Sequence, residues 1–209
     1  MDFELIEKAL PILLLGAGVT IEITAVSVFI GFCIGLFVGI ARICKVKVLR
    51  ILAAIYADCI RGTPLLVQIF LIYFALPIVT GHRVEPFVAA VAACGINSGA
   101  YVSEIFRAGI QAIDVGQMEA GRSLGLSWWQ TIILPQAVRN ILPPLGNEFI
   151  AMLKDSSLVS VIGFEELTRR GQLIIAQTYG SFEIWSTVAV LYLIMTLAIS
   201  RVVAMLEKK

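Results

Sequence analysis

The stretch LPILLLGAGVTIEITAVSVFIGFCIGLFVGIA runs from Leu10 to Ala41 and contains a single charged residue, Glu22. An apolar run of about 18 or more residues is long enough to cross the hydrocarbon core of a bilayer as a helix. The stretch lacks the regular alternation of apolar and polar residues that a membrane β-strand would show. It therefore predicts a transmembrane helix.

Apolar stretches of this kind recur along the chain. The 209 residues are 59% hydrophobic and 15% charged, whereas soluble domains have about 45–50% apolar and about 25% charged residues. We expect an all-α membrane protein with about five transmembrane helices, forming one transmembrane domain over residues 1–209. The recurring apolar stretches predict membrane lipid as surroundings, and the formal net charge of +1 argues against a nucleic-acid partner. The further expected spans are Ile51 to Val79, Pro86 to Ile110, Ile141 to Ile162 and Ile184 to Leu206.

Basic residues indicate how the chain is oriented, because lysine and arginine concentrate in cytoplasmic loops. Ten of them fall in segments expected on one side of the bilayer and four on the other. This asymmetry predicts an external N-terminus and a cytoplasmic C-terminus. The start of the chain is acidic where a signal peptide would be basic, so no signal peptide is expected. The ten residues are Arg42, Lys45, Lys47, Arg50, Arg107, Arg122, Arg139, Arg201, Lys208 and Lys209, and the four are Lys8, Arg83, Arg169 and Arg170.

Two loops and one glycine pattern carry further expectations. Gly31, Gly35 and Gly39 are spaced by four, which places them on one helix face and permits close approach of a neighbouring helix. The expected outer loop, residues 164–182, has mixed charge and is interpreted as a solvated face. The loop over residues 111–137 mixes apolar and polar residues, as a short helix lying on the cytoplasmic membrane surface would. A plain interfacial anchor and a docking helix both fit this loop.

The sequence offers little for catalysis or metal binding. His82 is the only histidine, which excludes a site built from several histidines, and the four cysteines form no CxxC pair. The cysteines are interpreted as small apolar fillers. No Ser-His or Cys-His pair is apparent, so no catalytic or metal-binding residue is expected.

Four motifs appear in a fixed order and together resemble one family. They are RGTPLLVQ at 61–68, AYVSEIFRAGI at 100–110, EAGRSLG at 119–125 with IILP at 132–135, and LPPLGNE at 142–148 with KDSSLVSVI at 154–162. They resemble the permease subunits of ABC importers, in particular the polar amino acid uptake subfamily, and the resemblance covers nearly the whole chain. The segment EAGRSLG, together with IILP, resembles the EAA motif of the cytoplasmic loop of these permeases.

The resemblance implies a type I ABC importer architecture in the bacterial inner membrane. In that family the EAA loop docks on a separate ATP-binding subunit, and the positions carried over for this contact are Glu119, Ala120 and Gly125. Partners implied are a dimer of ATP-binding cassette subunits, a second permease chain, identical or related, and an extracytoplasmic amino acid-binding protein. The chain has no GxxxxGK[ST] phosphate loop, so we expect ATP to be bound by the partner and no cofactor or enzymatic activity in this chain.

The loop departs from the family pattern at one place. The family has nine residues between the glycine and the Ile-x-Leu-Pro, whereas Leu126 to Thr131 makes six. Removing three residues from a helix rotates the residues after the deletion by about 60° and shortens the helix by about 4.5 Å. We therefore expect the orientation of this loop relative to the ATP-binding subunit to differ from that in other members of the family.

Ionisable residues inside the spans are candidates for substrate binding, because a charge at the bilayer centre costs at least about 2.5–3.5 kcal/mol. A free amino acid offers an ammonium that suits carboxylates and a carboxylate that suits N–H and hydroxyl donors. Two acids would also suit a basic amino acid such as arginine, lysine or histidine. The candidate residues are Glu104 and Asp155 for the ammonium, Asn97, Ser98 and Ser157 for the carboxylate, and Gln68 as a further pore-facing residue.

Structural pairings are the alternative for these charges. Lys154 could neutralise Asp155, Arg107 lies one turn from Glu104, and Asp58 lies three residues from Arg61. Two other functions also stay open. The membrane acids of an ion-coupled secondary carrier would relay protons, although the predicted docking helix argues against it. A membrane-embedded enzyme is disfavoured because an HExxH motif is absent and the chain has a single histidine, His82. We expect the permease subunit of an ATP-driven importer of polar amino acids.

Overall fold

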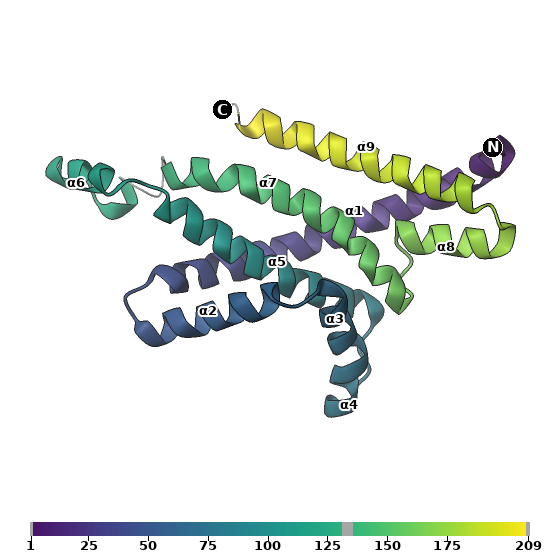
Figure 1. Cartoon of the computed structure of the whole chain (residues 1–209), viewed down its shortest axis with the longest axis horizontal. Helices are drawn as coiled ribbons and strands as arrows, with labels where there is room; N and C mark the ends of the chain where they lie inside the picture. Colours follow the sequence, from purple (N-terminus) through teal and green to yellow (C-terminus); the bar gives the residue numbers. More distant parts are fainter. Residues whose placement is uncertain (1, 131–135, 208–209) are drawn as a thin grey trace.

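The computed structural model describes residues 2–130 and 136–207, and every regular element in these ranges is helical. The long helices run beside one another along the longest axis, with α6 near one end and α8 near the other (Figure 1). The all-α prediction is confirmed. The elements are α1 Phe3–Ile43, α2 Lys47–Arg61, α3 Leu65–Phe70, η1 Leu71–Ala75, α4 Leu76–Thr80, α5 Pro86–Gln111, α6 Val115–Ser123, α7 Val138–Asp155, η3 Ser156–Ile162, α8 Leu167–Thr178 and α9 Ser181–Glu207.

Three helices in the described ranges, α1, α5 and α9, are long and apolar enough to cross a membrane singly. The expected second span is a bent pair, in which α2 and the segment from α3 to α4 meet at 101°. The expected fourth span is α7 continued by η3. It carries the charged residues Arg139, Glu148, Lys154 and Asp155, and it packs against α5 and α9. Of the residues of α7, Ile141, Met152 and Leu153 are buried. Among the described helices, three or, with the bent pair, up to four candidate spans are found rather than the expected five, and α7 is not one of them.

The glycine face of α1 packs against α5, as the spacing predicts. All three glycines are buried. A Cβ at Gly31 would lie 2.6 Å from the Cβ of Ser98, and a Cβ at Gly35 would lie 2.5 Å from a methyl of Val102. Among the described helices these two make the most extensive contact, because the glycines let the two backbones approach closely.

The bend after α2 has a local cause in the sequence. Pro64 cannot donate a backbone hydrogen bond, and Gly62 ends the helix just before it. The side chain of Gln68 donates to the carbonyls of Ile60 at 2.8 Å and Thr63 at 3.1 Å. Gln68 thereby satisfies backbone groups that the break leaves free inside the protein.

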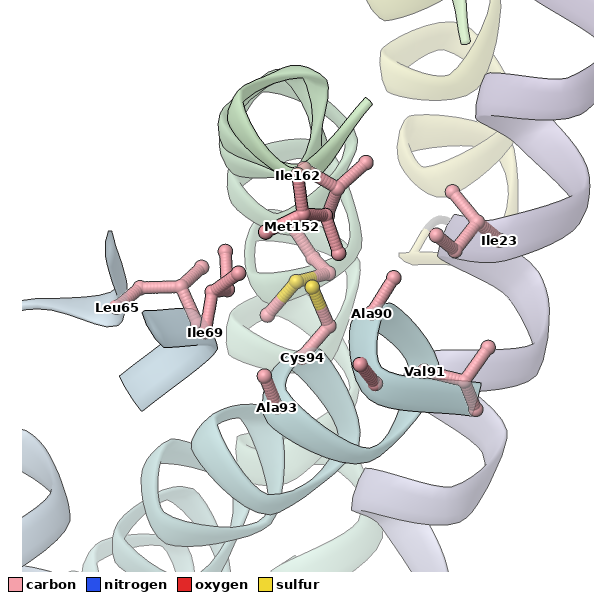
Figure 2. Packing of buried hydrophobic residues seen from close by; sticks show 11 residues of the cluster. Ile23, Leu65, Ile69, Ala90, Val91, Ala93, Cys94, Met152 and Ile162 are labelled. Atoms are coloured by element: carbon pink, nitrogen blue, oxygen red, sulfur yellow. The ribbon is translucent and has the colours of Figure 1, made fainter. Parts of the chain in front are cut away.

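Two apolar clusters hold the bundle together. One joins α1, α3, α5, α7 and η3, and Figure 2 shows Ile23, Ile69, Cys94 and Met152 among its members. The other joins α1 and α7 to α8 and α9. The first cluster lies next to the break after α2, so it fixes the position of the polar groups there.

Residues 164–182 are not a solvated loop as expected, because they contain α8. Its residues Leu167 and Gly171 are buried. The carboxylate of Glu166, which is itself fully buried, accepts hydrogen bonds from the amides of Thr168 at 2.9 Å and Arg169 at 2.8 Å. This N-terminal cap satisfies backbone donors that the first turn of α8 would leave unpaired.

Candidate functional site

A polar cavity of about 430 Å³ lies where α2 breaks. Its walls come from the break itself, from the middle of α5 and from the junction of α7 with η3. All three segments meet at membrane depth in the predicted arrangement of spans. The lining residues are Arg61, Gly62, Thr63, Pro64, Leu65, Asn97, Tyr101, Asp155 and Leu158.

One hydrogen bond ties two walls of the cavity together. The amide nitrogen of Asn97 donates to the side-chain oxygen of Gln68 at 3.1 Å. Gln68 in turn donates to the backbone carbonyls of the break. Asn97 and Gln68 are 5% and 7% exposed, so the polar bond is almost fully removed from solvent.

The cavity wall carries one acid and one base. Asp155 ends α7 with its side chain exposed, and no ion pair joins it to Lys154 in the described part of the chain. The guanidinium of Arg61 lies over the ring of Tyr101, 5.4 Å from its centroid. The two opposite charges suit a zwitterion.

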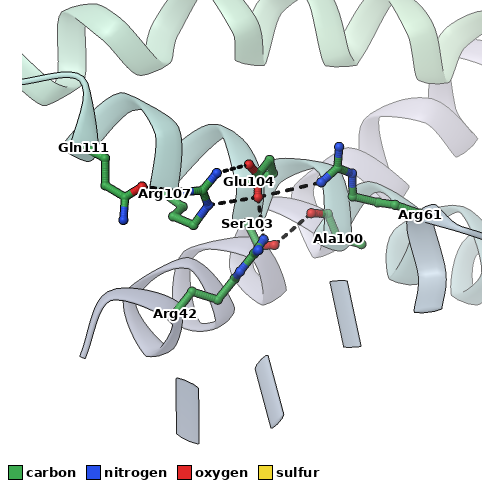
Figure 3. A network of polar contacts seen from close by, with 7 residues as sticks. All are labelled: Arg42, Arg61, Ala100, Ser103, Glu104, Arg107 and Gln111. Carbon is green, nitrogen blue, oxygen red and sulfur yellow. Dashed lines mark hydrogen bonds and ion pairs between the residues drawn. The ribbon is translucent and has the colours of Figure 1, made fainter. Parts of the chain in front are cut away.

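Glu104 is surrounded by three arginines, as Figure 3 shows. Arg42 donates to its carboxylate at 2.5 Å, Arg107 donates to both carboxylate oxygens, and Arg61 approaches it to 3.7 Å. The alternative pairing of Glu104 with Arg107 is thus present. The suggested pairing of Asp58 with Arg61 is wrong, because Arg61 turns towards α5.

The predicted site residues are only partly gathered. Asn97 and Asp155 line the cavity, and Gln68 supports it from behind. Ser98 is fully buried against Gly31, whereas Glu104 lines a second cavity of about 330 Å³ between α5 and α7. Ser157 is half-buried and does not line the cavity at the break.

Sequence reasoning missed that Arg61 and the turn after it form a cavity wall. The signal was the Gly-Thr-Pro that comes directly after Arg61, since glycine and proline punctuate helices. That signal predicts a break in the span, but it does not say which residues of α5 and α7 the break faces.

The EAA-like segment forms α6, which projects at one end of the molecule (Figure 1). Asp114 caps it by accepting from the amide of Gly116 at 2.7 Å. The helix ends at Ser123. Gly125 follows with a φ of +77°, a left-handed conformation, and the amides of Gly125 and Leu126 donate hydrogen bonds back to the last turn. This C-terminal motif uses glycine because other residues are strained there.

Glu119 and Ala120 are exposed on α6. The carboxylate of Glu119 makes no ion pair within residues 2–130 and 136–207. Both residues are therefore available to a second protein. Ile132 and Pro135 of the shortened motif fall outside the described residues, so the expected change in the orientation of the loop stays a prediction.

The comparisons with known proteins agree with this geometry. Residues 31–209 match the family model described as "Binding-protein-dependent transport system inner membrane component". The glutamine transport system permease protein GlnP of Escherichia coli strain K12 is 47% identical over 212 residues, covering 100% of this chain and 97% of its own length. A putative glutamine transport system permease protein GlnP of Rickettsia felis is 39% identical, covering 99% of this chain and 98% of its own length.

Solved structures give the same fold. A crystal structure of an amino acid ABC transporter with histidines superimposes with a TM-score of 0.93 at 45% identity, covering 100% of this chain and 98% of that one. An inward-facing MetNI methionine ABC transporter has a TM-score of 0.81 at 21% identity, again covering 100% and 98%, and shows the fold alone. The ion-coupled carrier is not retained. The chain belongs to the binding-protein-dependent transport system inner membrane components, as the permease subunit of an amino acid ABC importer.

Proposed function

We propose that this permease conducts a neutral polar amino acid, which binds at the break after α2. The observation that carries the proposal is that Asp155 and Arg61 both line this cavity. Asp155 would take the α-ammonium, and Arg61 would take the α-carboxylate in a charge-assisted pair. Asn97, held by Gln68, would offer its amide to the amino acid side chain.

The charge balance favours a neutral amino acid over a basic one. A basic side chain would need a second free carboxylate beside Asp155. The carboxylate of Glu104 already has Arg42, Arg61 and Arg107 around it. The names of the relatives, which are glutamine permeases, point in the same direction, and glutamine is the first substrate to test.

The partners are inferred from the family and from the exposed ends of the molecule. Two permease chains, identical or related, would surround the pathway, because one copy has few spans. The α6 end would face the cytoplasm, where Glu119, Ala120 and Gly125 would contact an ATP-binding cassette subunit that binds and hydrolyses the ATP. A binding protein would deliver the amino acid at the opposite end, where α8 presents Arg169 and Arg170.

Uptake by the reconstituted importer tests the proposal. Proteoliposomes that contain the permease, its ATP-binding subunits and its binding protein are loaded with ATP and given radiolabelled glutamine. We expect uptake that unlabelled glutamine or asparagine suppresses more strongly than arginine does. Asp155→Asn should raise the KM by about tenfold or more, since loss of a hydrogen bond to a charged group costs about 1.5–3 kcal/mol. Suppression by arginine alone would contradict the proposal.

A further inference from the structure

The Glu104 cluster lies between the cavity and α6. Asn97, Tyr101, Glu104 and Ala108 succeed one another at helical spacing along one face of α5. The first two line the cavity at the break, and the last two line the second cavity. Glu104 is thus the first ionised group on α5 that lies beyond the cavity in the direction of α6.

The three arginines around Glu104 come from three different elements. Arg42 belongs to the end of α1, Arg61 to the end of α2 and Arg107 to the next turn of α5 (Figure 3). All four side chains are at most partly exposed: 12% for Arg42, 23% for Glu104, 30% for Arg107 and 37% for Arg61. One carboxylate therefore fastens three elements, and the cluster keeps an excess of positive charge.

The contacts of Glu104 are unequal. Arg42 and Arg107 donate hydrogen bonds to it, whereas Arg61 is at 3.7 Å and is the most exposed of the three. Arg61 is also the arginine that lines the cavity. It can therefore exchange Glu104 for another carboxylate that arrives in the cavity, while the other two arginines stay in place.

The contacts continue from Glu104 towards α6. Arg107 donates to the side-chain oxygen of Gln111, which is the last residue of α5. Asp114, three residues later, caps α6 through the amide of Gly116. The side-chain contacts thus reach Gln111, and the backbone over residues 112–114 connects Gln111 to the helix that presents Glu119.

We propose that Glu104 is the hub of a polar relay that reports occupancy of the cavity to α6. The proposal depends on the proposed function, because the carboxylate that Arg61 exchanges for Glu104 is that of the bound amino acid. Arg61 is the two-state element that a coupling mechanism requires. In the empty state it adds a third positive charge to Glu104; in the occupied state it binds substrate, and Glu104 is held by Arg42 and Arg107 alone. The change shifts the end of α5, and with it α6.

In this role Glu104 is a positioning residue rather than a substrate ligand. Its replacement should uncouple ATP hydrolysis from substrate without weakening substrate binding. The measurement is ATP hydrolysis by the reconstituted importer with and without glutamine and binding protein, together with equilibrium binding of radiolabelled glutamine to the permease complex. We expect Glu104→Gln to lose the stimulation by glutamine, by at least about fivefold, the lower end of common allosteric coupling factors. Glutamine binding should not weaken, because the carboxylate that competes with the substrate for Arg61 is removed.

Further variants separate the relay from a purely structural role. Gln111→Ala removes only the last contact and should lower the stimulation while the thermal stability stays that of the wild type. Arg50→Gln removes an exposed arginine at the start of α2 that forms no ion pair in the described ranges, and it should behave as wild type. The effects of Arg61→Gln and Glu104→Gln on stimulation should be non-additive, as expected for two residues of one unit.

Three results would overturn the relay. Stimulation of Glu104→Gln to the wild-type level would show that Glu104 transmits nothing. Stimulation that returns at high glutamine would make Glu104 a substrate ligand. Equal losses of stability, binding and basal hydrolysis would make its role structural. A wild-type importer that takes up no amino acid would contradict the proposed function itself, whereas normal wild-type uptake with a fully stimulated Glu104→Gln variant contradicts the relay alone.

Discussion

Asn97 of α5 donates a hydrogen bond to Gln68 of α3 at 3.1 Å, and this bond fastens the broken second span to the centre of the bundle. Gln68 also holds the carbonyls of Ile60 and Thr63. The side chain of Gln68 thus serves as hydrogen-bond partner both for the backbone carbonyls at the break and for Asn97 in the cavity wall. Buried polar groups that lose a partner are expensive, so this bond fixes the shape of the site.

Gln68→Ala should therefore weaken substrate binding strongly, because one substitution removes the hydrogen-bond partner of several buried groups at the site. The carbonyl groups of the break and the amide of Asn97 lose their partner, at about 1–3 kcal/mol for a buried unsatisfied group, and we expect the KM for glutamine uptake to rise about tenfold. Gln177→Ala, at an exposed position of α8, is the matched control and should leave uptake unchanged. Wild-type KM in Gln68→Ala would show that the break keeps its shape unaided.

Gly35 and Gly18 of α1 offer a matched pair for the packing against α5. A Cβ at Gly35 would meet a Val102 methyl at 2.5 Å and the Ser103 backbone at 2.9 Å, whereas a Cβ at Gly18 meets nothing within 4 Å. Gly35→Ala should lower the free energy of unfolding by about 1–3 kcal/mol through overpacking. Gly18→Ala should raise it by about 0.5–1 kcal/mol, since alanine favours a helix. Thermal unfolding in detergent measures both, and a change of the same sign in both variants would contradict the prediction.

The long apolar helices were predictable because a bilayer sets their length, and the α1 glycine face was predictable because helical spacing fixes it. Gly62 and Pro64 indicate a break after α2, but they do not indicate the cavity that forms there. The direction of a bend, and the α5 residues it meets, depend on tertiary packing. Sequence spacing suggested Asp58 as the partner of Arg61, whereas the fold brings Glu104 closer. The helix α8 was not predicted, because its charged residues made the segment resemble a solvent-exposed loop, although one side of the helix is apolar and buried.

Glu119 of α6 and Gly125, which follows the end of this helix, should both be needed for coupling. Glu119→Arg reverses the charge of an exposed side chain without an ion pair in the described part of the chain, so uptake should fall to background while the unfolding temperature stays within about 2 °C of the wild type, as for surface substitutions. Gly125→Ala places a Cβ in a left-handed conformation, which costs about 1–2 kcal/mol.

Gly125→Asn is the control for that strain, because asparagine tolerates the left-handed region. We expect ATP-dependent uptake to be lowered in Gly125→Ala and largely restored in Gly125→Asn. Equal uptake by both variants would mean that the backbone conformation at Gly125 does not matter for docking. Uptake by Glu119→Arg at the wild-type level would remove Glu119 from the contact with the ATP-binding subunit.

Glu166, between η3 and α8, should make stability depend on pH. Burial raises the pKa of its carboxyl, against the lowering effect of the hydrogen bonds from Thr168, Arg169 and Tyr192. A raised folded-state pKa means that the folded protein holds this proton more tightly than the unfolded chain does. The resulting stabilisation is fully present below the unfolded pKa, about 4.3, and is lost as pH rises through the folded pKa.

Glu166→Gln keeps an acceptor for the cap but cannot ionise, so it should remove this contribution. We expect the unfolding temperature of the wild type to fall more steeply than that of Glu166→Gln as pH rises from about 4 to about 8, and the difference between the two curves isolates this one group. Glu183→Gln, in the first turn of α9, serves as a control and should behave as the wild type does. Parallel curves for wild type and Glu166→Gln would mean that Glu166 ionises alike in the folded and unfolded chains.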